Sequence, residues 1–402
     1  MTGAPLQIML VAVEPSADAI GASLIRELKE LAPEAVLTGC GGAEMAREGL
    51  VSLFPVDAFS VMGAIDVLRV APLAMQRARE LAETAAARKI DVAVFVDGWA
   101  FSRFSTTRLR KLSPATTSIK FVAPQVWASR PQRVEFVRKF FDGVLALLPF
   151  EPQYFQRVGV RAEYVGNPNF QAAWHARGAG AAFRARHRLG DAPVLAVLLG
   201  SRKREVTRLA RPFRDAVTLL SREMPALRIV SPVAPSVAPL VAKRLKGWPG
   251  EPILVGPDEK YDAMAAANVA LTASGTASTE LAINRTPMVV AYKVDPVTGF
   301  WARRVTTTPF ASIINVAADR FVIPEFIQEN CEGGYIATAL EALFNDPAAY
   351  VDQAEAFDAI LKELGVDGPS AARLAATRVI EWAHLGKKRS MVPRPRASGP
   401  VP

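Results

Sequence analysis

The stretch Ala273-Ser-Gly-Thr-Ala-Ser-Thr-Glu280 follows a hydrophobic strand pattern and opens a helix pattern. Its small hydroxyl and glycine residues leave backbone N–H groups bare at a helix start, where the helix dipole favours a phosphate. Glu280 has no Ser or Thr three residues before it, so it cannot close a capping box and needs another partner. A diphosphate held at Ser274, Gly275 and Thr276, with Glu280 on a ribose hydroxyl, would form a nucleotide-sugar site. The alternative is a helix with a polar first turn.

A second unit of strand, turn and helix lies earlier in the chain. Val194 to Leu199 is a continuous apolar run, which is typical of a buried parallel strand. The turn Gly200-Ser201-Arg202 follows at once and opens a long helix pattern. We expect the backbone N–H groups of this helix entry, at Gly200 and Ser201, to help hold the diphosphate. Arg202 can bind a diphosphate bidentately and stabilise the charge that builds on it as a sugar bond breaks. Lys203 and Arg204 are better explained as a solvated basic surface.

Length and composition favour a globular protein of two domains. The chain has 402 residues, half of them hydrophobic, which is enough for two separate cores. It contains no apolar run of eighteen residues, and Met1 to Pro5 lacks the pattern of a secretory signal, so we expect a cytoplasmic protein. With two distant cysteines and three scattered histidines, we expect no disulfide framework, no zinc site and no cofactor.

The basic charge predicts an anionic partner. The formal charge is +9 and the isoelectric point is near 9.7, which suits nucleic acid, an anionic membrane surface or a phosphorylated substrate. Aromatic residues are not interleaved with the basic ones as in single-strand binders, so we expect no nucleic-acid partner.

Strand and helix patterns alternate in two series, which predicts an α/β fold with two Rossmann-like domains, parallel sheets and a cleft between them. The predicted strands are 8–13, 36–40, 90–96, 119–122 and 144–147, then 194–199, 227–230, 253–255, 269–272 and 288–292. A Gly- and Ala-rich stretch at 178–180 predicts the boundary. The expected organisation is therefore 1–177, 178–347, helices over 348–385 that return to the first domain, and a basic disordered tail over 386–402.

Ligands of such sheets bind outside the carboxyl ends of the strands. Asp97 ends one buried strand, where its carboxylate could take a proton from an attacking sugar hydroxyl, although an Asp capping the next helix fits equally well by position. Glu14 and Asp18 are more consistent with structural roles, as a loop-bonding carboxylate and a cap. Trp127 is either a ligand-stacking residue or part of the core.

An ordered set of motifs covers most of the chain: Glu14-Pro-Ser-Ala-Asp18, Phe59-Ser-Val-Met-Gly63, Val96-Asp97, Val122-Ala-Pro-Gln-Val-Trp-Ala128, Leu148-Pro-Phe-Glu151, Gly200-Ser-Arg202 with Glu205, Ser274-Gly-Thr-Ala277 with Glu280, Pro287-Met-Val-Val-Ala-Tyr292, and Asn315. This set resembles the bacterial lipid-A-disaccharide synthases, which are glycosyltransferases of the two-domain GT-B type.

The resemblance implies transfer of diacylglucosamine from its UDP derivative onto diacylglucosamine 1-phosphate, with a β-1,6 link, inversion and release of UDP. It implies Asp97 as the base and Arg202 as an essential arginine, and it links Asn315 to function. We predict that Asn315 and Gln125 bind substrate. The nucleotide is expected on the C-terminal domain, without a metal.

Departures from the family pattern cluster near the expected cleft. Asp97-Gly-Trp99-Ala100-Phe101 stands for Asp-Ala-Pro-Asp-Phe, so Asp97 is the only acid left there. Gln125, Asn167 and Lys203 replace the usual Ser, His and Gly. We expect these changes to affect substrate preference rather than to abolish activity, because the base and the arginine both remain.

The apolar stretch 61–75, flanked by Arg69, Arg77 and Arg79, is too short and interrupted to span a bilayer. It suits peripheral attachment to the cytoplasmic leaflet of the inner membrane, where it would admit the acyl chains of both substrates. A buried helix pair explains it equally well.

Two other functions fit the sequence. Another UDP-sugar enzyme of the same architecture, such as an epimerase or a lipid-linked sugar transferase, would share these turns. An inactive lipid-binding paralogue would share the fold alone. The oligomeric state is open, and a homodimer is one of the options.

Overall fold

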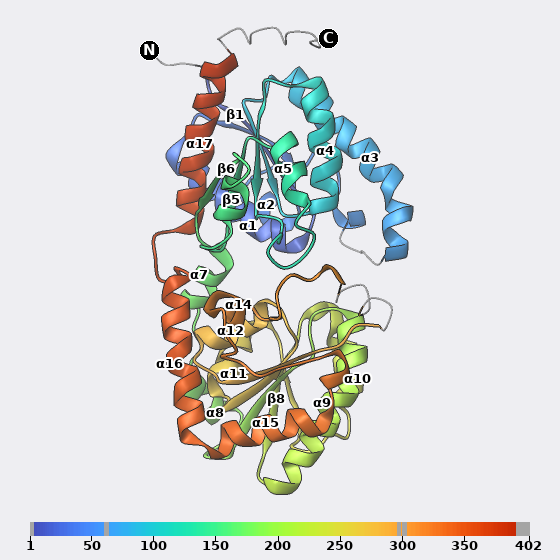
Figure 1. The fold of residues 1–402 in the computed structure, drawn as a ribbon, viewed down its shortest axis with the longest axis vertical. Coiled ribbons are helices and arrows are strands. Elements are labelled where there is room, and N and C mark those ends of the chain that lie inside the picture. The colour runs from blue at the N-terminus through green and yellow to red at the C-terminus, as the bar shows by residue number, and fades with distance from the viewer. Residues whose placement is uncertain (1–3, 60–63, 296–298, 300–303, 391–402) are drawn as a thin grey trace. The chain divides into compact units, whose positions relative to one another are not determined.

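The chain folds into two compact units, which consist of residues 1–168 with 368–402 and of residues 169–367. The structure is a computed structural model that describes residues 4–59, 64–295, 299 and 304–390. Within these residues each unit contains one six-stranded sheet (Figure 1). The predicted α/β class, with two parallel sheets of Rossmann type, is confirmed.

The sheet of the first unit has the strand order β2-β1-β3-β4-β5-β6, and all neighbours pair in parallel. Its strands are β1 (Gln7–Ala12), β2 (Val36–Cys40), β3 (Val92–Val96), β4 (Thr117–Phe121), β5 (Gly143–Ala146) and β6 (Arg161–Tyr164). Its helices are α1 (Pro15–Leu31), α2 (Ala43–Arg47), α3 (Ala64–Ala87), α4 (Trp99–Leu112), α5 (Arg133–Phe140), α6 (Pro152–Gln156) and α17 (Ala371–Ser390).

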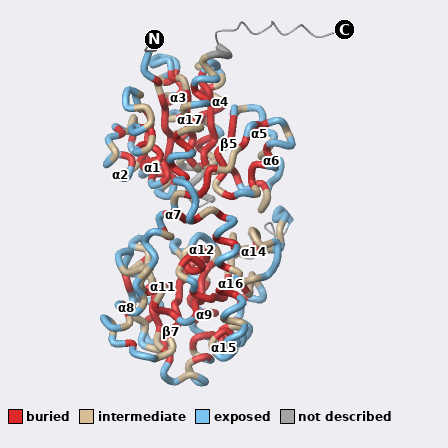
Figure 2. Tube along the Cα trace, turned by 90° about the vertical axis from the view of Figure 1, so that its left-hand side faces the viewer, coloured by how far each residue is buried: buried red, intermediate tan, exposed pale blue. Residues whose placement is uncertain are grey.

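Strand β3 shows why this sheet is covered on both faces. All of its residues are buried, and side chains alternate between the two faces of a strand. Val92, Val94 and Val96 join a hydrophobic cluster with α1 and α17, whereas Ala93 and Phe95 join another with α3 and α4. Figure 2 shows the buried strands between more exposed helices. An unbroken apolar run is the sequence signature of such a strand.

The last helix belongs to the first unit, where α17 packs against α1. The indole of Trp382 lies on β5, and a Cβ at Gly143 would come within 2.2 Å of it. Lys387 pairs with Asp91 at 2.8 Å. The prediction of a disordered tail over 386–402 is therefore wrong for 386–390, because these contacts extend the helix to Ser390; residues 391–402 lie outside the described part.

The sheet of the second unit has the order β12-β11-β10-β7-β8-β9, again in parallel. Its strands are β7 (Val194–Leu198), β8 (Arg228–Pro232), β9 (Ile253–Val255), β10 (Val269–Thr272), β11 (Met288–Tyr292) and β12 (Glu325–Ile327). The helices are α7 (Pro168–His175), α8 (Gly180–Arg186), α9 (Lys203–Glu223), α10 (Ala238–Leu245), α11 (Lys260–Ala266), α12 (Thr276–Ile283), α14 (Ile313–Ala318), α15 (Gly333–Asn345) and α16 (Pro347–Glu363).

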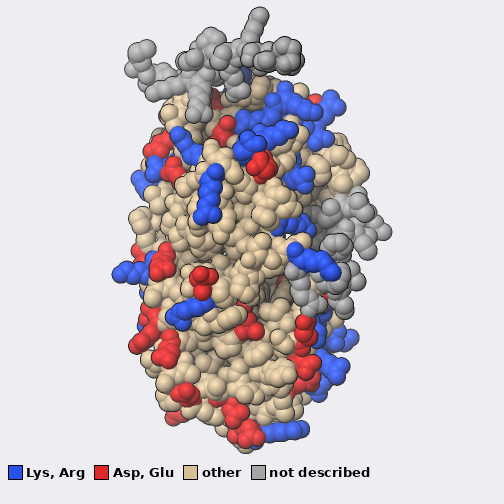
Figure 3. Space-filling model, in the orientation of Figure 1, with Lys and Arg blue, Asp and Glu red and all other residues tan. Residues whose placement is uncertain are grey.

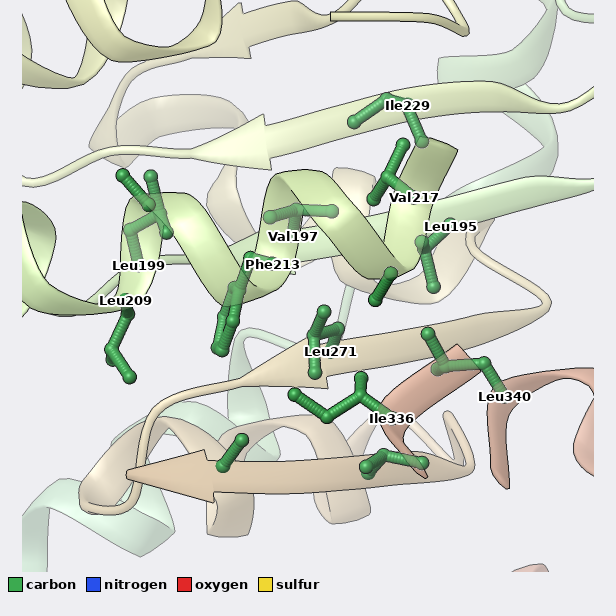
Figure 4. Packing of buried hydrophobic residues seen from close by; sticks show 14 of the residues in the cluster. Leu195, Val197, Leu199, Leu209, Phe213, Val217, Ile229, Leu271, Ile336 and Leu340 are labelled. Carbon is green, nitrogen blue, oxygen red and sulfur yellow. The ribbon is translucent and has the colours of Figure 1, made fainter. Parts of the chain in front are cut away.

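One face of the second sheet packs against α9 and α15. Figure 4 shows Phe213 and Val217 of α9 and Ile336 of α15 among side chains of the strands, such as Val197 and Leu271. This core fixes the ends of β7 and β10, after which the two predicted phosphate-binding turns begin.

The expected domain boundary at 178–180 differs from the division at Pro168 and Asn169. The Gly- and Ala-rich stretch is anchored within the second unit, because the Gly178 N–H donates to Asn284 Oδ1 at 3.0 Å and the Ala179 N–H donates to Asp262 Oδ1 at 2.7 Å. Helix α16 also packs in the second unit, against α12 and α15, so α17 alone makes the predicted return.

Candidate functional site

Asp97 lies directly after β3, in a backbone turn that moves the chain out of the sheet. Asp97 and Gly98 both have left-handed backbone angles, with φ of 46° and 51°, a conformation that is uncommon for a residue other than glycine. The Asp97 N–H still donates to the Phe121 carbonyl of β4 at 2.9 Å. The carboxylate is half-buried. Among the described residues, Ser102 and Lys120 donate to the Asp97 backbone carbonyl, and none donates a hydrogen bond to its carboxylate. Asp97 therefore combines a fixed backbone with a side chain that is open to a ligand.

Lys120 supports this turn from inside the unit. Its ammonium donates to the carbonyl oxygens of Asp97 at 2.5 Å, Phe95 at 3.2 Å and Phe121 at 3.3 Å. Burial lowers the pKa of Lys120 to about 8, against the opposing effect of the negative charges of Asp97 and Glu14. Sequence reasoning missed Lys120, although a lysine inside the apolar strand Thr117-Ser-Ile-Lys-Phe121 was a visible signal.

Two acids after β1 have different surroundings. Asp18 is buried and accepts hydrogen bonds from the backbone N–H groups of Gly42, Glu44 and Met45 at 2.7, 2.8 and 3.2 Å. It thereby caps helix α2, which confirms its predicted structural role. Glu14 is half-buried, and a Cβ at Gly98 would lie 3.8 Å from its Oε1 atom, so it lies beside the turn that carries Asp97.

The loop after β4 presents Gln125 and anchors Trp127. Gln125 is exposed, which leaves its amide accessible to a ligand. The Trp127 indole donates to Glu151 Oε1 at 3.1 Å and lies edge-on to Phe150. Burial raises the pKa of Glu151 to about 7, although the three hydrogen bonds that this carboxylate accepts oppose the rise. The half-buried Trp127 side chain is thus held in one position beside the loop.

In the turn after β7, the backbone N–H groups are bonded to the carboxylate of Glu205. Glu205 Oε2 accepts the backbone N–H groups of Ser201 at 3.0 Å and Arg202 at 3.2 Å. Gly200 has a φ of 96°, and a Cβ there would meet the same carboxylate at 2.4 Å. The expectation that these N–H groups hold a diphosphate is therefore wrong, because Glu205 already occupies them. The Arg202 side chain is 79% exposed and remains accessible to a ligand, with one contact to Glu205 at 3.1 Å.

The turn after β10 is open to solvent. Gly275 and Thr276 are exposed, and α12 begins at Thr276, so the first N–H groups of this helix point where an anion can bind. The Ser274 hydroxyl donates to the Ala311 carbonyl at 2.7 Å, which fixes the turn. The Ala273 N–H donates to the Leu198 carbonyl at 3.0 Å, so this turn and the turn of Arg202 leave neighbouring strands at the same edge.

Glu280 cannot form a capping box, and it pairs instead with Lys260 and Tyr261. Its Oε1 atom accepts from the Lys260 ammonium at 2.7 Å and from the Tyr261 hydroxyl at 3.3 Å. Both residues lie on α11, which sequence reasoning did not connect with this site. The Glu280 carboxylate is thereby fixed beside the exposed start of α12.

Asn315 is wrongly predicted as a substrate-binding residue. It is fully buried, and its side-chain NH₂ donates to the Ile323 carbonyl and to Glu325 Oε1, both at 2.8 Å. Its side-chain oxygen accepts the N–H groups of Val322 and Ile323, both at 2.9 Å. These four bonds use the full capacity of the amide. Asn315 is instead a structural residue.

The Asn315 network reaches the turn after β10 through Glu325. The Glu325 carboxylate accepts the N–H groups of Ala311 at 2.7 Å and Ser312 at 2.8 Å. Ala311 in turn accepts the Ser274 hydroxyl. Asn315 therefore acts on the candidate anion site by positioning, through the two intervening residues Glu325 and Ala311.

The described residues contain neither a metal-binding group of side chains nor a membrane-spanning helix. No group of three or more His, Cys, Asp or Glu side chains is arranged to hold a metal ion there. In the same part of the chain, every helix is too short or too polar to cross a membrane. Residues 61–63 of the predicted membrane-facing stretch lie outside the described residues.

Comparisons with known proteins give a consistent family. The family model for lipid-A-disaccharide synthetase matches residues 8–375. The lipid-A-disaccharide synthase of Paramagnetospirillum magneticum is 38% identical over 386 residues, covering 95% of this chain and 99% of the relative. That of Ruegeria pomeroyi is 40% identical over 392 residues, with 94% and 96% covered.

Solved structures share the fold at low identity. The UDP-GlcNAc 2-epimerase from Neisseria meningitidis bound to UDP-GlcNAc superposes with a TM-score of 0.59 at 13% identity, covering 95% of this chain and 99% of that one. A glycosyltransferase from Rickettsia africae gives 0.56 at 10% identity, with 96% and 99% covered. These likenesses identify the two-unit architecture as GT-B.

Proposed function

The chain belongs to the lipid-A-disaccharide synthase family, and from this membership we propose the course of its reaction. It is a glycosyltransferase of lipid A biosynthesis. The acceptor is 2,3-diacylglucosamine 1-phosphate and the donor is UDP-2,3-diacylglucosamine. The acceptor 6-hydroxyl forms a bond to the anomeric carbon, the bond from that carbon to the diphosphate breaks, and UDP leaves. The observation that carries this proposal is the family match, which extends over both units.

Asp97 is the base that takes the proton of the acceptor hydroxyl. Its left-handed turn and its contacts with β4 and Lys120 hold the backbone in place, while its carboxylate is half-buried. A positioned carboxylate of this kind accelerates attack by removing the proton as the new bond forms. Direct attack on one face of the sugar gives inversion, so the product is β-linked.

The second unit binds the UDP moiety. The Arg202 guanidinium neutralises the charge that grows on the diphosphate, and the first turn of α12, at Ser274, Gly275 and Thr276, contributes N–H donors. Glu280 accepts a ribose hydroxyl. Support comes from solved structures of this architecture that contain bound UDP or UDP-GlcNAc.

The first unit receives the acceptor, and Gln125 contacts it from the loop after β4. We place this unit at the cytoplasmic leaflet of the inner membrane, because both substrates carry acyl chains and the chain is strongly basic. The apolar stretch 61–75 is the proposed contact; of its described side chains, Met75 is exposed.

A product assay separates this proposal from its main alternative. An epimerase is the main alternative to test, because UDP-GlcNAc 2-epimerases are among the solved structures that share this fold. The purified protein is given both substrates in detergent with EDTA. We expect disaccharide and UDP in equal amounts. An epimerised UDP-sugar without net release of UDP would contradict the proposal, and so would UDP release with free diacylglucosamine, which is hydrolysis.

A further inference from the structure

Most of the net positive charge of the chain comes from one segment of the first unit. Residues 99–142 contain nine Lys and Arg against two Asp and Glu. The two acids are already paired, Asp142 with Arg110 at 2.7 Å and Glu135 with Arg138 at 2.8 Å. Figure 3 shows Lys and Arg side chains gathered over this part of the first unit. The two acids of the segment therefore leave most of its cations without a carboxylate partner from the same segment.

Two of these cations are stacked on two aromatic rings that contact each other. The Arg133 guanidinium lies 5.0 Å from the centre of the Trp99 ring, and the Arg103 guanidinium lies 5.2 Å from that of Phe136. The two rings contact each other edge to face, with centres 5.5 Å apart. Stacking on a ring limits the motion of a guanidinium while its N–H groups stay available in the plane.

Arg130 completes this group from the loop before α5. Its carbonyl accepts the Arg133 N–H at 3.0 Å, and its φ of 54° turns the chain there. Burial lowers the pKa of Arg133, and the positive charges of Arg130 and Arg103 lower it further. The Arg133 guanidinium is thus close enough to Arg130 and Arg103 to be repelled by both. Within the described residues, none of the three forms an ion pair with a carboxylate.

The arginine cluster, defined as Arg103, Arg130 and Arg133, lies at the edge of the sheet where Asp97 is found. Trp99 opens α4 two residues after Asp97, and Arg130 and Arg133 follow β4, the neighbour of β3. Solubility requires charged side chains at the surface, but it does not require arginines that are stacked on aromatic rings beside the Asp97 turn. A ligand with a hydroxyl for Asp97 and a dianionic group elsewhere on the same small ring fits both features.

We propose that the arginine cluster binds the 1-phosphate of the acceptor and so sets the sugar with its 6-hydroxyl toward Asp97. This inference rests on the proposed function. Two or three guanidinium groups around a phosphomonoester form charge-assisted, partly bidentate hydrogen bonds, and the anion relieves the repulsion within the cluster. Arg103, Arg130 and Arg133 are then positioning and specificity residues for the acceptor.

The test measures acceptor binding directly, so it does not depend on turnover. Diacylglucosamine 1-phosphate in detergent micelles is titrated into the full chain, and affinity is read by calorimetry and by the fluorescence of Trp99 and its neighbours. Diacylglucosamine without the phosphate is titrated in parallel. The variants are Arg130→Gln and Arg133→Gln, and the control is Lys111→Gln, which removes the same charge at the far end of α4 from an exposed, unstacked side chain.

We expect each arginine variant to bind the phosphorylated acceptor roughly tenfold to hundredfold more weakly, the range for losing hydrogen bonds to a charged group. Binding of the dephosphorylated compound and of UDP stays within about twofold of the parent, as does every affinity of the control. This pattern supports the cluster even if the parent makes no disaccharide, in which case the proposed function fails alone.

Three results overturn the inference. In the first, the parent binds both acceptor forms equally. In the second, Lys111→Gln weakens binding as much as the arginine variants do, which means general charge attraction. In the third, the arginine variants lose binding to vesicles of phosphatidylglycerol while their acceptor affinity in detergent is unchanged, which assigns the cluster to the membrane surface.

Discussion

Lys120 is the residue whose protonation the site depends on most closely, since its ammonium ties the carbonyl of Asp97 to those of Phe95 and Phe121. Its pKa of about 8 lies below the ordinary value of 10.5 because of burial. Between these two values the unfolded chain binds more protons than the folded one, so this group makes the free energy of unfolding rise with pH.

Lys120→Met tests that sign. The free energy of unfolding is measured by urea denaturation from pH 7 to pH 10.5 for parent and variant. We expect the difference between them to change across pH 8 to 10.5, with the parent gaining stability relative to the variant, because only the parent has this depressed pKa. A difference that is constant with pH means that Lys120 titrates normally.

Asn315→Ala separates a positioning role from direct contact. The variant leaves buried N–H and carbonyl groups of 322–325 without partners, so we expect the free energy of unfolding to fall by about 3 kcal/mol or more. UDP affinity should fall with it, because the Ser274 turn loses support. Calorimetric titration with UDP and denaturation are measured together. Weakened UDP binding at parental stability would contradict the buried network.

For single residues, the sequence predicted where a site residue lies better than it predicted the hydrogen-bond partners of that residue. Asp97 and Arg202 were found because each follows an apolar strand, and the carboxyl end of a parallel strand is where ligands bind. Lys120 and the partners of Asn315 were not found, because they are defined by contacts across β3 and β4 or between loop and helix. Such contacts leave no periodic signal in the chain.

Among the elements, the two turns after β7 and β10 resemble each other in sequence but not in hydrogen bonding. Glu205 closes the first turn from within α9, whereas α12 has no acid in its first turn and keeps its start open. The first turn therefore offers a ligand the Arg202 side chain, and the second offers backbone N–H groups.

Arg202→Ala tests this division, with Arg204→Ala as its control, since Arg204 is an equally exposed neighbour in α9. Because Arg202 is 79% exposed, its removal should change the free energy of unfolding by less than about 0.5 kcal/mol. Disaccharide formation should fall about a hundredfold to a thousandfold, while Arg204→Ala keeps parental activity. Equal activity in the two variants would remove Arg202 from the reaction.

Ten of the twelve strands in the described residues match a run that the sequence pattern predicted. The bounds of β2, β9, β10 and β11 agree with the sequence pattern. The central strands β10 and β11 read as apolar runs because parallel strands buried on both faces do so. The edge strands β6 and β12 were missed, since Arg161–Tyr164 and Glu325–Ile327 are only partly buried and carry polar residues. Burial, rather than hydrogen bonding, is what the sequence pattern reports.

On the scale of the whole molecule, the chain leaves the first unit at Pro168 and returns to it at residue 368. Helix α17 then completes the core that α1 and β3 begin, through Ala375, Val379 and Trp382. The sequence predicted the helix and its return, but not that α16 stays in the second unit, because both helices carry similar apolar faces.

Trp382→Ala measures what this return contributes. The indole is 4% exposed and lies on β5, so its loss should lower the free energy of unfolding by about 3–5 kcal/mol. Leu385→Ala is the control on the same helix, since Leu385 is 43% exposed, and it should cost less than about 0.5 kcal/mol. Thermal denaturation of both compares them. Similar losses in both variants would mean that α17 does not complete this core.

The whole account requires that chemistry on the first unit and nucleotide binding on the second be separable, and Asp97→Asn tests this most directly. Disaccharide formation is measured with saturating donor and acceptor, and UDP affinity is measured on the same preparation by calorimetry. We predict that turnover falls about a hundredfold or more while UDP affinity stays within about twofold of the parent. Parental turnover in Asp97→Asn would contradict the assignment of the base, and with it the proposed mechanism.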